Sequence, residues 1–144
     1  MSEITNLMGS FSQSMDTKGR MSFPLKLREE IGEKFVITRG LGGCLFAYSL
    51  EAFKKKADAI RAVPMSKGLT MQRFFLSWAS EVEADKQGRI LVPQNLREFA
   101  GLSKEIIVTG VADRAEIWDK ARWDEFNCNI DEQDIMEQME GLDF

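Results

Sequence analysis

The sequence predicts a mixed β/α, β-rich fold in which one small unit occurs twice. Residues 16–24 read DTKGRMSFP and residues 85–93 read DKQGRILVP, so nearly the same segment recurs 69 positions later. The similarity continues into LKLREEIG and QNLREFAG, at the same offset. Each copy covers about 40 residues, too few to bury a core alone. The copies are therefore expected to share one barrel-like core with pseudo-twofold symmetry.

Each copy is expected to open with two short strands joined by a tight turn. Phe11 marks the first strand of one copy, and Val82 is the clearest apolar position of its counterpart. Asp-x-x-Gly predicts the turn at 16–19 and again at 85–88. Its Asp side chain accepts hydrogen bonds from the following backbone, and its Gly suits a positive φ.

A short helix should follow each second strand. Pro24 and Pro93 end these strands, because proline cannot donate to a ladder but suits the first turn of a helix. The two helices are then expected to stop at Gly32 and Gly101.

A β-hairpin is predicted next in each copy, at 35–49 and 106–119, with GLGG and VADR as the turns. Ser49 and Asp119 follow these hairpins and are predicted to act as N-caps of a further helix.

Two helices should connect the copies. The first runs over 50–62 until Val63 and Pro64 break it, and the second is expected to begin at Thr70. Apolar residues at near-helical spacing in the second helix predict packing in a core or an interface: Met71, Phe74, Phe75 and Trp78.

The predicted division is a first repeat at 10–52, a helical connector at 53–78, a second repeat at 79–122 and an acidic tail at 127–144. Within that tail, the last 16 residues hold six Asp/Glu and no basic residue, with only a thin apolar stripe. This pattern predicts a solvated helix or a frayed end.

The net charge of −4 is unevenly distributed. Residues 1–69 carry 11 Lys/Arg and 7 Asp/Glu, a balance of +4, whereas residues 70–144 carry 8 and 16, a balance of −8. A polyanion is therefore expected to meet local positive charge in the first half.

The inventory of reactive residues argues against an enzyme. The chain has no histidine, and Cys44 and Cys128 stand alone, so zinc ligand sets and Ser-His or Cys-His nucleophiles are excluded. No cofactor, metal or small-molecule substrate is expected, and both cysteines are interpreted as structural. No apolar run of about 18 residues predicts a membrane span, and no signal peptide is recognised, so the expected compartment is the cytoplasm.

The repeated turns are the candidate functional site. Each turn carries two basic side chains, Lys18 and Arg20 in one copy and Lys86 and Arg89 in the other. An Arg on a rigid turn suits phosphate oxygens or the O6/N7 edge of guanine. The alternative is an Asp–Arg ion pair that only fixes each loop, which is worth about 0–1 kcal/mol at a surface.

Other basic residues carry weaker predictions. Arg28 and Arg97, on the short helices, can pair with carboxylates such as Glu29, Glu30 and Glu98 as readily as touch DNA, and they stay outside the predicted site. The lysines at 54–56 favour a solvated helix face over an extended DNA surface.

Several segments together resemble the MraZ family of bacterial transcriptional regulators, which has two AbrB-like half-domains. They are DTKGRMSFPLKLRE, RGLGGCLFAYS, EVEADKQGRILVPQNLREFAGLSKEIIVTG and EIWD followed by RW. The match covers about residues 8–126 in the expected order.

This resemblance implies a duplicated AbrB-like swapped-hairpin fold, a double-split β-barrel with short helices. It also implies a ring-like homo-oligomer that binds double-stranded DNA at short direct repeats upstream of the division and cell-wall gene cluster. Members are described as repressors of that operon, including their own gene, so association with the nucleoid is expected.

The family's DNA-contacting turns carry over to Asp16, Lys18, Gly19 and Arg20, and to Asp85, Gly88 and Arg89, with Lys86 adding charge in the second copy. Repetition has a physical reason, because one turn neutralises few phosphates and several turns on one body raise affinity.

Two rival functions remain. AbrB-like folds also occur in DNA-binding antitoxins whose tails wrap a toxin, and this chain has an acidic tail. The other rival is a structural ring that does not bind DNA, in which the turns are only stabilised corners.

Overall fold

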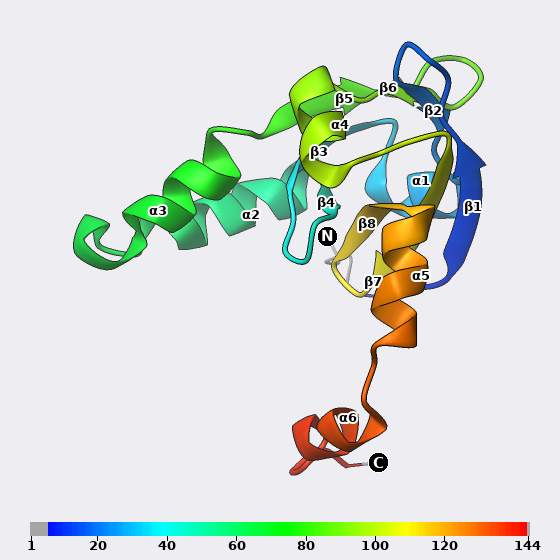
Figure 1. Cartoon of the computed structure of the whole chain (residues 1–144). Helices are drawn as coiled ribbons and strands as arrows, with labels where there is room; N and C mark the ends of the chain where they lie inside the picture. Colours follow the sequence, from blue (N-terminus) through cyan, green and yellow to red (C-terminus); the bar gives the residue numbers. More distant parts are fainter. Residues whose placement is uncertain (1–5, 144) are drawn as a thin grey trace.

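The computed structural model describes residues 6–143, so residues 1–5 and Phe144 of the predicted tail lie outside the described residues. Its strands are β1 (Ser10–Ser14), β2 (Arg20–Ser22), β3 (Lys34–Arg39), β4 (Leu45–Ser49), β5 (Ser80–Glu83), β6 (Arg89–Leu91), β7 (Glu105–Val111) and β8 (Arg114–Asp119). Its helices are α1 (Leu25–Ile31), α2 (Leu50–Arg61), α3 (Met65–Leu76), α4 (Gln94–Ala100), α5 (Lys120–Cys128) and α6 (Glu132–Gln138). The mixed, β-rich composition predicted from the sequence is confirmed (Figure 1).

Strands are exchanged between the two copies. Six strands form an antiparallel sheet in the order β1-β7-β8-β4-β3-β5, and β2 pairs with β6 in a second, two-stranded sheet. β1 of the first copy pairs with β7 of the second, and β5 of the second copy pairs with β3 of the first. The hairpin of each copy therefore gains a third strand from the other copy.

The register between the copies is symmetric at two places. In the β2–β6 pair, Met21 lies opposite Ile90, and these residues occupy equivalent positions in the repeated segments. In the β4–β8 pair, Phe46 lies opposite Glu116. Exchanging the copies leaves both pairs in place.

The main core draws on both copies. Phe23 and Phe35 come from the first, Leu96 and Ile106 come from the second, and each is at most 1% exposed. Burying such a side chain stabilises the fold by about 1.5–3 kcal/mol. The shared core explains why the predicted copies need one another.

The two short helices begin and end as predicted. Pro24 and Pro93 are the N-cap residues of α1 and α4. Gly32, with φ 101°, and Gly101, with φ 60°, are the C-caps. Both glycines adopt the backbone conformation that other residues avoid.

The predicted caps of the longer helices differ in their chemistry. The Ser49 hydroxyl accepts a hydrogen bond from the Ala52 amide at 3.0 Å, as an N-cap should. Asp119 is the N-cap residue of α5, as predicted, but its side chain makes no cap hydrogen bond. Its carboxylate instead accepts from the amide and hydroxyl of Ser103, at 3.2 and 2.6 Å, because the loop after α4 brings those donors close.

The second connecting helix begins earlier than predicted. α3 starts at Met65, directly after Pro64, and Thr70 lies inside it. Proline fixes φ near its helical value and so starts a helix here rather than only breaking one. Gly68 lets α3 approach Val63, since a Cβ there would lie 2.6 Å from a Val63 methyl carbon.

α3 packs against the sheet through its aromatic residues, as its spacing predicts. The Phe75 carbonyl accepts from the Thr38 hydroxyl at 2.6 Å, and the Arg39 guanidinium lies 4.1 Å from the ring centroids of both Phe74 and Trp78. The α2–α3 hairpin projects beyond these contacts, away from the sheet (Figure 1).

The acidic tail contains a helix, so of the two predicted states, a solvated helix and a frayed end, the structure has the helix. α6 lies apart from the sheets, at the end of a short link after α5 (Figure 1). Its side chains are exposed along its length.

The two cysteines differ. Cys44 is fully buried, and burial raises the pKa of its thiol to about 12, which fits the predicted structural role. Cys128 is exposed, so packing gives it no structural role and that prediction is wrong.

Within residues 6–143, every helix is too short or too polar to cross a membrane.

Candidate nucleic-acid interface

The first turn, residues 16–20, is organised by one carboxylate. Asp16 Oδ1 accepts hydrogen bonds from the amides of Lys18 and Arg20, both at 2.9 Å. The backbone closes the same turn, since the Gly19 amide donates to the Asp16 carbonyl at 3.1 Å and the Asp16 amide donates to the Arg20 carbonyl at 2.9 Å. Gly19 has φ 90°, as predicted for this position.

The second turn, residues 85–89, repeats this pattern. Asp85 Oδ1 accepts from the amides of Gln87 and Arg89 at 2.8 and 2.9 Å, and Gly88 has φ 77°. One bond is added, because Arg89 Nε donates to Asp85 Oδ2 at 3.2 Å. The turn chemistry expected of Asp-x-x-Gly is therefore present in both copies.

Hydrogen bonding also explains the ionisation of the two aspartates. The amide of Arg20 is the main reason that the pKa of Asp16 lies below its ordinary value. The amide of Arg89 has the same effect on the pKa of Asp85. Both carboxylates therefore stay charged at neutral pH and hold the loop backbone.

The two turns lie at opposite ends of one short ribbon. Beyond the β2–β6 pair, the Val92 amide donates to the Gly19 carbonyl and the Phe23 amide donates to the Gly88 carbonyl, both at 2.9 Å. Four residue steps separate the ends, which corresponds to roughly 13 Å. Both loops project from the same side of the molecule, above β2 and β6 (Figure 1), so one duplex can meet both.

The predicted cations differ in how far they are engaged. Lys18, Arg20 and Lys86 are exposed, and their side chains form no hydrogen bond or ion pair with any residue between 6 and 143. Arg89 is half-buried and paired with Asp85. The ion-pair alternative raised by the sequence thus applies to the second turn and not to the first.

Two arginines outside the predicted site contact the turns. The guanidinium of Arg97 lies against Gly19, and that of Arg28 lies against Gly88. Arg28 pairs with a nearby carboxylate, as the sequence allowed, but its partner is Glu33 at 3.2 Å rather than Glu29 or Glu30. Arg97 donates from Nε to the Val92 carbonyl at 3.0 Å rather than pairing with Glu98. The available signal was the repeated LRE, which places an arginine at the same point of each copy.

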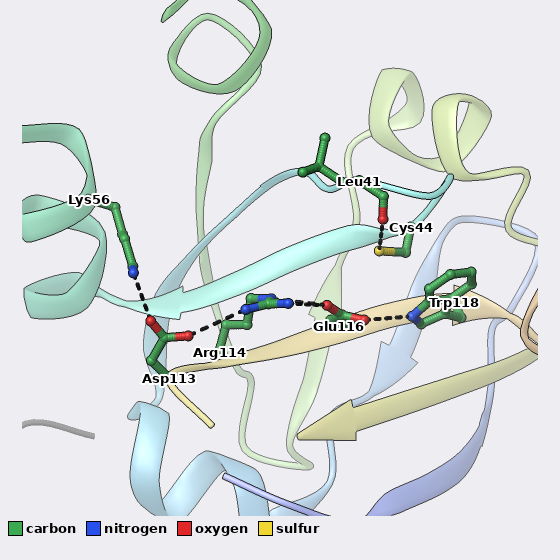
Figure 2. Close-up of polar contacts among 7 residues, drawn as sticks. All are labelled: Leu41, Cys44, Lys56, Asp113, Arg114, Glu116 and Trp118. Atoms are coloured by element: carbon green, nitrogen blue, oxygen red, sulfur yellow. Dashed lines mark hydrogen bonds and ion pairs between the residues drawn. The ribbon is translucent and has the colours of Figure 1, made fainter. Parts of the chain in front are cut away.

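A second polar cluster lies away from the turns, where α2 meets the β7–β8 hairpin (Figure 2). Lys56 pairs with Asp113 at 2.7 Å, and Arg114 lies between Asp113 and Glu116. The Glu116 carboxylate, 8% exposed, accepts from Arg114 at 2.8 Å and from Trp118 Nε1 at 3.0 Å. Both of its oxygens are engaged, so this cluster joins elements rather than offering a reactive group.

In the part of the chain that the structure describes, no three His, Cys, Asp or Glu residues are grouped as metal ligands would be.

Comparison with known proteins adds the family. A family model described as "MraZ protein, putative antitoxin-like" matches residues 7–71 and 75–143. The chain is 47% identical over 138 residues to the transcriptional regulator MraZ of Acetivibrio thermocellus, covering 93% of this chain and 96% of that relative. It is 47% identical over 140 residues to the transcriptional regulator MraZ of Thermoanaerobacter sp. strain X514, covering 94% and 98%.

A third transcriptional regulator MraZ, from Clostridium beijerinckii, is 46% identical over 138 residues, covering 94% of this chain and 97% of that relative. The resemblance inferred from the repeated segments is confirmed, and the chain belongs to the MraZ family.

Proposed function

We propose that this protein is a sequence-specific DNA-binding transcriptional regulator that reads double-stranded DNA with its two turns. The supporting observation is the pair of rigid, cation-bearing loops on one side of the molecule. Arg20 and Arg89 approach base edges or adjacent phosphates, and Lys18 and Lys86 hold phosphates. The aspartates and glycines of the turns keep the loops in one shape.

The targets proposed are short direct repeats upstream of the division and cell-wall gene cluster. The protein represses that cluster, beginning with its own gene, and acts at the nucleoid in the cytoplasm without catalysing a reaction. The family resemblance and the relatives named as transcriptional regulators support this role.

We assign the fold to the duplicated AbrB-like double-split β-barrel, with repeats at 10–52 and 79–122, a connector at 53–78 and a tail at 127–144. The exchange of β1 and β5 between the copies supports this assignment. The symmetric β2–β6 register supports it further.

The protein works as a ring-like homo-oligomer. One chain has four cations on its turns, so a single molecule of net charge −4 is expected to bind DNA weakly. Two projections of opposite charge are suited to join neighbouring copies: the α2–α3 hairpin at 50–76 has six Lys/Arg and two Asp/Glu, and the tail at 129–144 has six Asp/Glu. A contact between different surfaces of successive copies closes a ring when the rotation allows it.

Truncation after Cys128 tests the tail's part in assembly. The truncated chain should have a lower mass in solution, and assembly of the full chain should weaken with salt. An unchanged mass would show that other surfaces join the copies.

The antitoxin-like alternative draws on the wording of the matching family model and on the exposed acidic helix α6. A pull-down with the full chain as bait separates the two functions, since an antitoxin captures a toxin through its tail and a regulator of its own promoter does not need to.

The direct test is binding to a DNA fragment from immediately upstream of the protein's own gene, at several salt concentrations, beside a random fragment of equal length. Tight binding to the upstream fragment with a steep salt slope is expected. Equal and weak binding to both fragments would reject the proposal and favour a structural ring.

A further inference from the structure

Arg97 and Arg28, which we call the crossed arginines, contact the turns at their glycines. A Cβ at position 19 would lie 2.6 Å from both Cζ and Nε of Arg97. A Cβ at position 88 would lie 2.5 Å from Nη2 and 2.7 Å from Cζ of Arg28. Each guanidinium thus occupies the space that a side chain on the turn would need, and each glycine is buried.

Each crossed arginine is fixed by a backbone carbonyl near the ribbon. Arg97 Nε donates to the Val92 carbonyl and Arg28 Nε donates to the Phe23 carbonyl, both at 3.0 Å. Arg28 is held further by Glu33, and its side chain is only 15% exposed. Arg28 is thus engaged through both Nε and Nη1, whereas Arg97 is anchored through Nε.

The same two carbonyl-bearing residues also hold the turns. The Val92 amide donates to the Gly19 carbonyl, so Val92 bonds the turn through its amide and Arg97 through its carbonyl. Phe23 connects Gly88 and Arg28 in the same way. Each turn glycine therefore has two supports. Val92 or Phe23 donates a backbone hydrogen bond to the glycine's carbonyl, and the same residue accepts a hydrogen bond from the arginine that packs against the glycine.

The contacts cross between the copies. Arg97 belongs to α4 in the second copy and supports the turn of the first, which bears Arg20. Arg28 belongs to α1 in the first copy and supports the turn of the second, which bears Arg89. Each turn depends on the helix of the opposite copy.

Resting on the proposed function, we infer that Arg28 and Arg97 are positioning residues for DNA reading, each setting the shape of the opposite copy's turn. The sequence repeat then has a second role, because the helix of each copy supports the DNA-contacting turn of the other. A lysine at either position would keep the charge but lose the planar group and the Nε bond.

Hydrogen–deuterium exchange of the full chain without DNA tests the crossing. Arg97→Ala should speed exchange in residues 16–20 and leave 85–89 close to wild type, and Arg28→Ala should do the reverse. Lys26→Ala, an exposed change on the same helix as Arg28, is the control and should alter neither turn. The inference would be overturned if both turns kept their protection from exchange in both arginine variants. It would also be overturned if each variant lost protection only in the turn of its own copy.

Operator binding tests the consequence through a double-mutant cycle. Arg20→Ala with Arg97→Ala should lose little more affinity than Arg20→Ala alone, because both changes disable one turn. Arg20→Ala with Arg28→Ala should show losses that multiply, because the changes affect different turns.

Lysine variants separate positioning from direct phosphate contact. Arg97→Lys should behave like Arg97→Ala in both exchange and binding. Two results together would overturn the inference: Arg97→Lys binds DNA as tightly as wild type, and the affinity losses of Arg20→Ala and Arg97→Ala multiply in the double variant. They would show that Arg97 contacts a phosphate directly. If no variant affects DNA binding, the proposed function fails, while the exchange pattern still decides whether the crossed support exists.

Discussion

The first turn and the second turn share their backbone bonds but differ in the state of their arginine. In both, one Asp oxygen accepts from the amides two and four residues on. Arg20 is exposed and makes no side-chain bond to another described residue, whereas Arg89 is half-buried and donates to Asp85. The duplicated segment therefore provides one exposed arginine without a side-chain partner among the described residues and one held in an ion pair, which would have to break for the proposed contact with DNA.

The turns also differ in where their lysine sits. Lys18 directly precedes Gly19, whereas Gln87 holds the equivalent position in the second turn and Lys86 lies one residue earlier. The two loops thus have the same backbone shape and the same net charge, but their lysines stand at different positions.

Removing the arginines should produce the largest effect. Arg20→Ala is expected to cost about 1–3 kcal/mol of operator binding, or roughly 5- to 150-fold. Arg89→Ala should cost less, because its guanidinium is already paired. Binding titrations with both variants, after confirming their fold and mass, measure the difference; a larger loss for Arg89→Ala would reverse the ranking of the turns.

Replacing the turn glycines should come next. Gly19→Ala and Gly88→Ala should each lower the free energy of unfolding by roughly 1–3 kcal/mol, since they combine a strained φ with displacement of an arginine. Gly42→Ala is the matched control, because Gly42 has φ 93° but a Cβ there would meet only Trp118 at 3.5 Å. If denaturant titrations show that Gly19→Ala loses no more unfolding free energy than Gly42→Ala, the contact with Arg97 does not support the turn.

Neutralising the turn aspartates should have a smaller effect. Asp85→Asn and Asp16→Asn each keep an oxygen for the backbone bonds and each remove one negative charge. Only Asp85→Asn also releases an arginine, so its DNA affinity should rise more than that of Asp16→Asn, by at most about fivefold, since an exposed pair is worth about 0–1 kcal/mol. Equal changes in the two variants would show that the Arg89 ion pair does not affect binding.

Acidification should give the smallest effect. Asp16 and Asp85 have folded-state pKa values lowered from 3.8 by backbone hydrogen bonds, so the stability they add is present above about pH 4 and is lost as pH falls through the lowered values. Between about pH 5 and pH 3, the thermal midpoint of wild type should fall more than that of a variant carrying both Asn substitutions. Parallel curves would mean that these bonds do not stabilise the turns.

Much of the fold could be read from local chemistry. Turn, proline and glycine signals placed the turns at 16–19 and 85–88 and the ends of the short helices, because these residues restrict φ or donors in their own neighbourhood. The start of α3 was misplaced because Pro64 both ends one helix and begins the next. Asp119 was correctly placed as the N-cap residue of α5, but the bonding of its side chain was not predicted, because its partner Ser103 is distant in sequence.

The geometry of the candidate turns was predictable from the sequence, but the contacts that support them were not. Lys18, Arg20, Lys86 and Arg89 were identified by the repeated motif, and the free or paired state of each arginine was not. The contacts of Arg28 and Arg97 depend on strand exchange between copies, which the spacing within one copy does not reveal.

The most direct test of the central claim, that the paired turns are the DNA-contacting surface, is the salt dependence of operator binding. The variant Lys18→Ala with Lys86→Ala is compared with Lys54→Ala with Lys67→Ala, which removes equal charge from exposed positions on the α2–α3 hairpin. Because this hairpin is also the proposed assembly surface, both variants are first confirmed to have the wild-type mass in solution. The account predicts a salt slope that is shallower by about 0.9 for each phosphate that the turn variant no longer neutralises, and a wild-type slope in the hairpin variant. A wild-type slope in the turn variant, with a reduced slope in the hairpin variant, would contradict it.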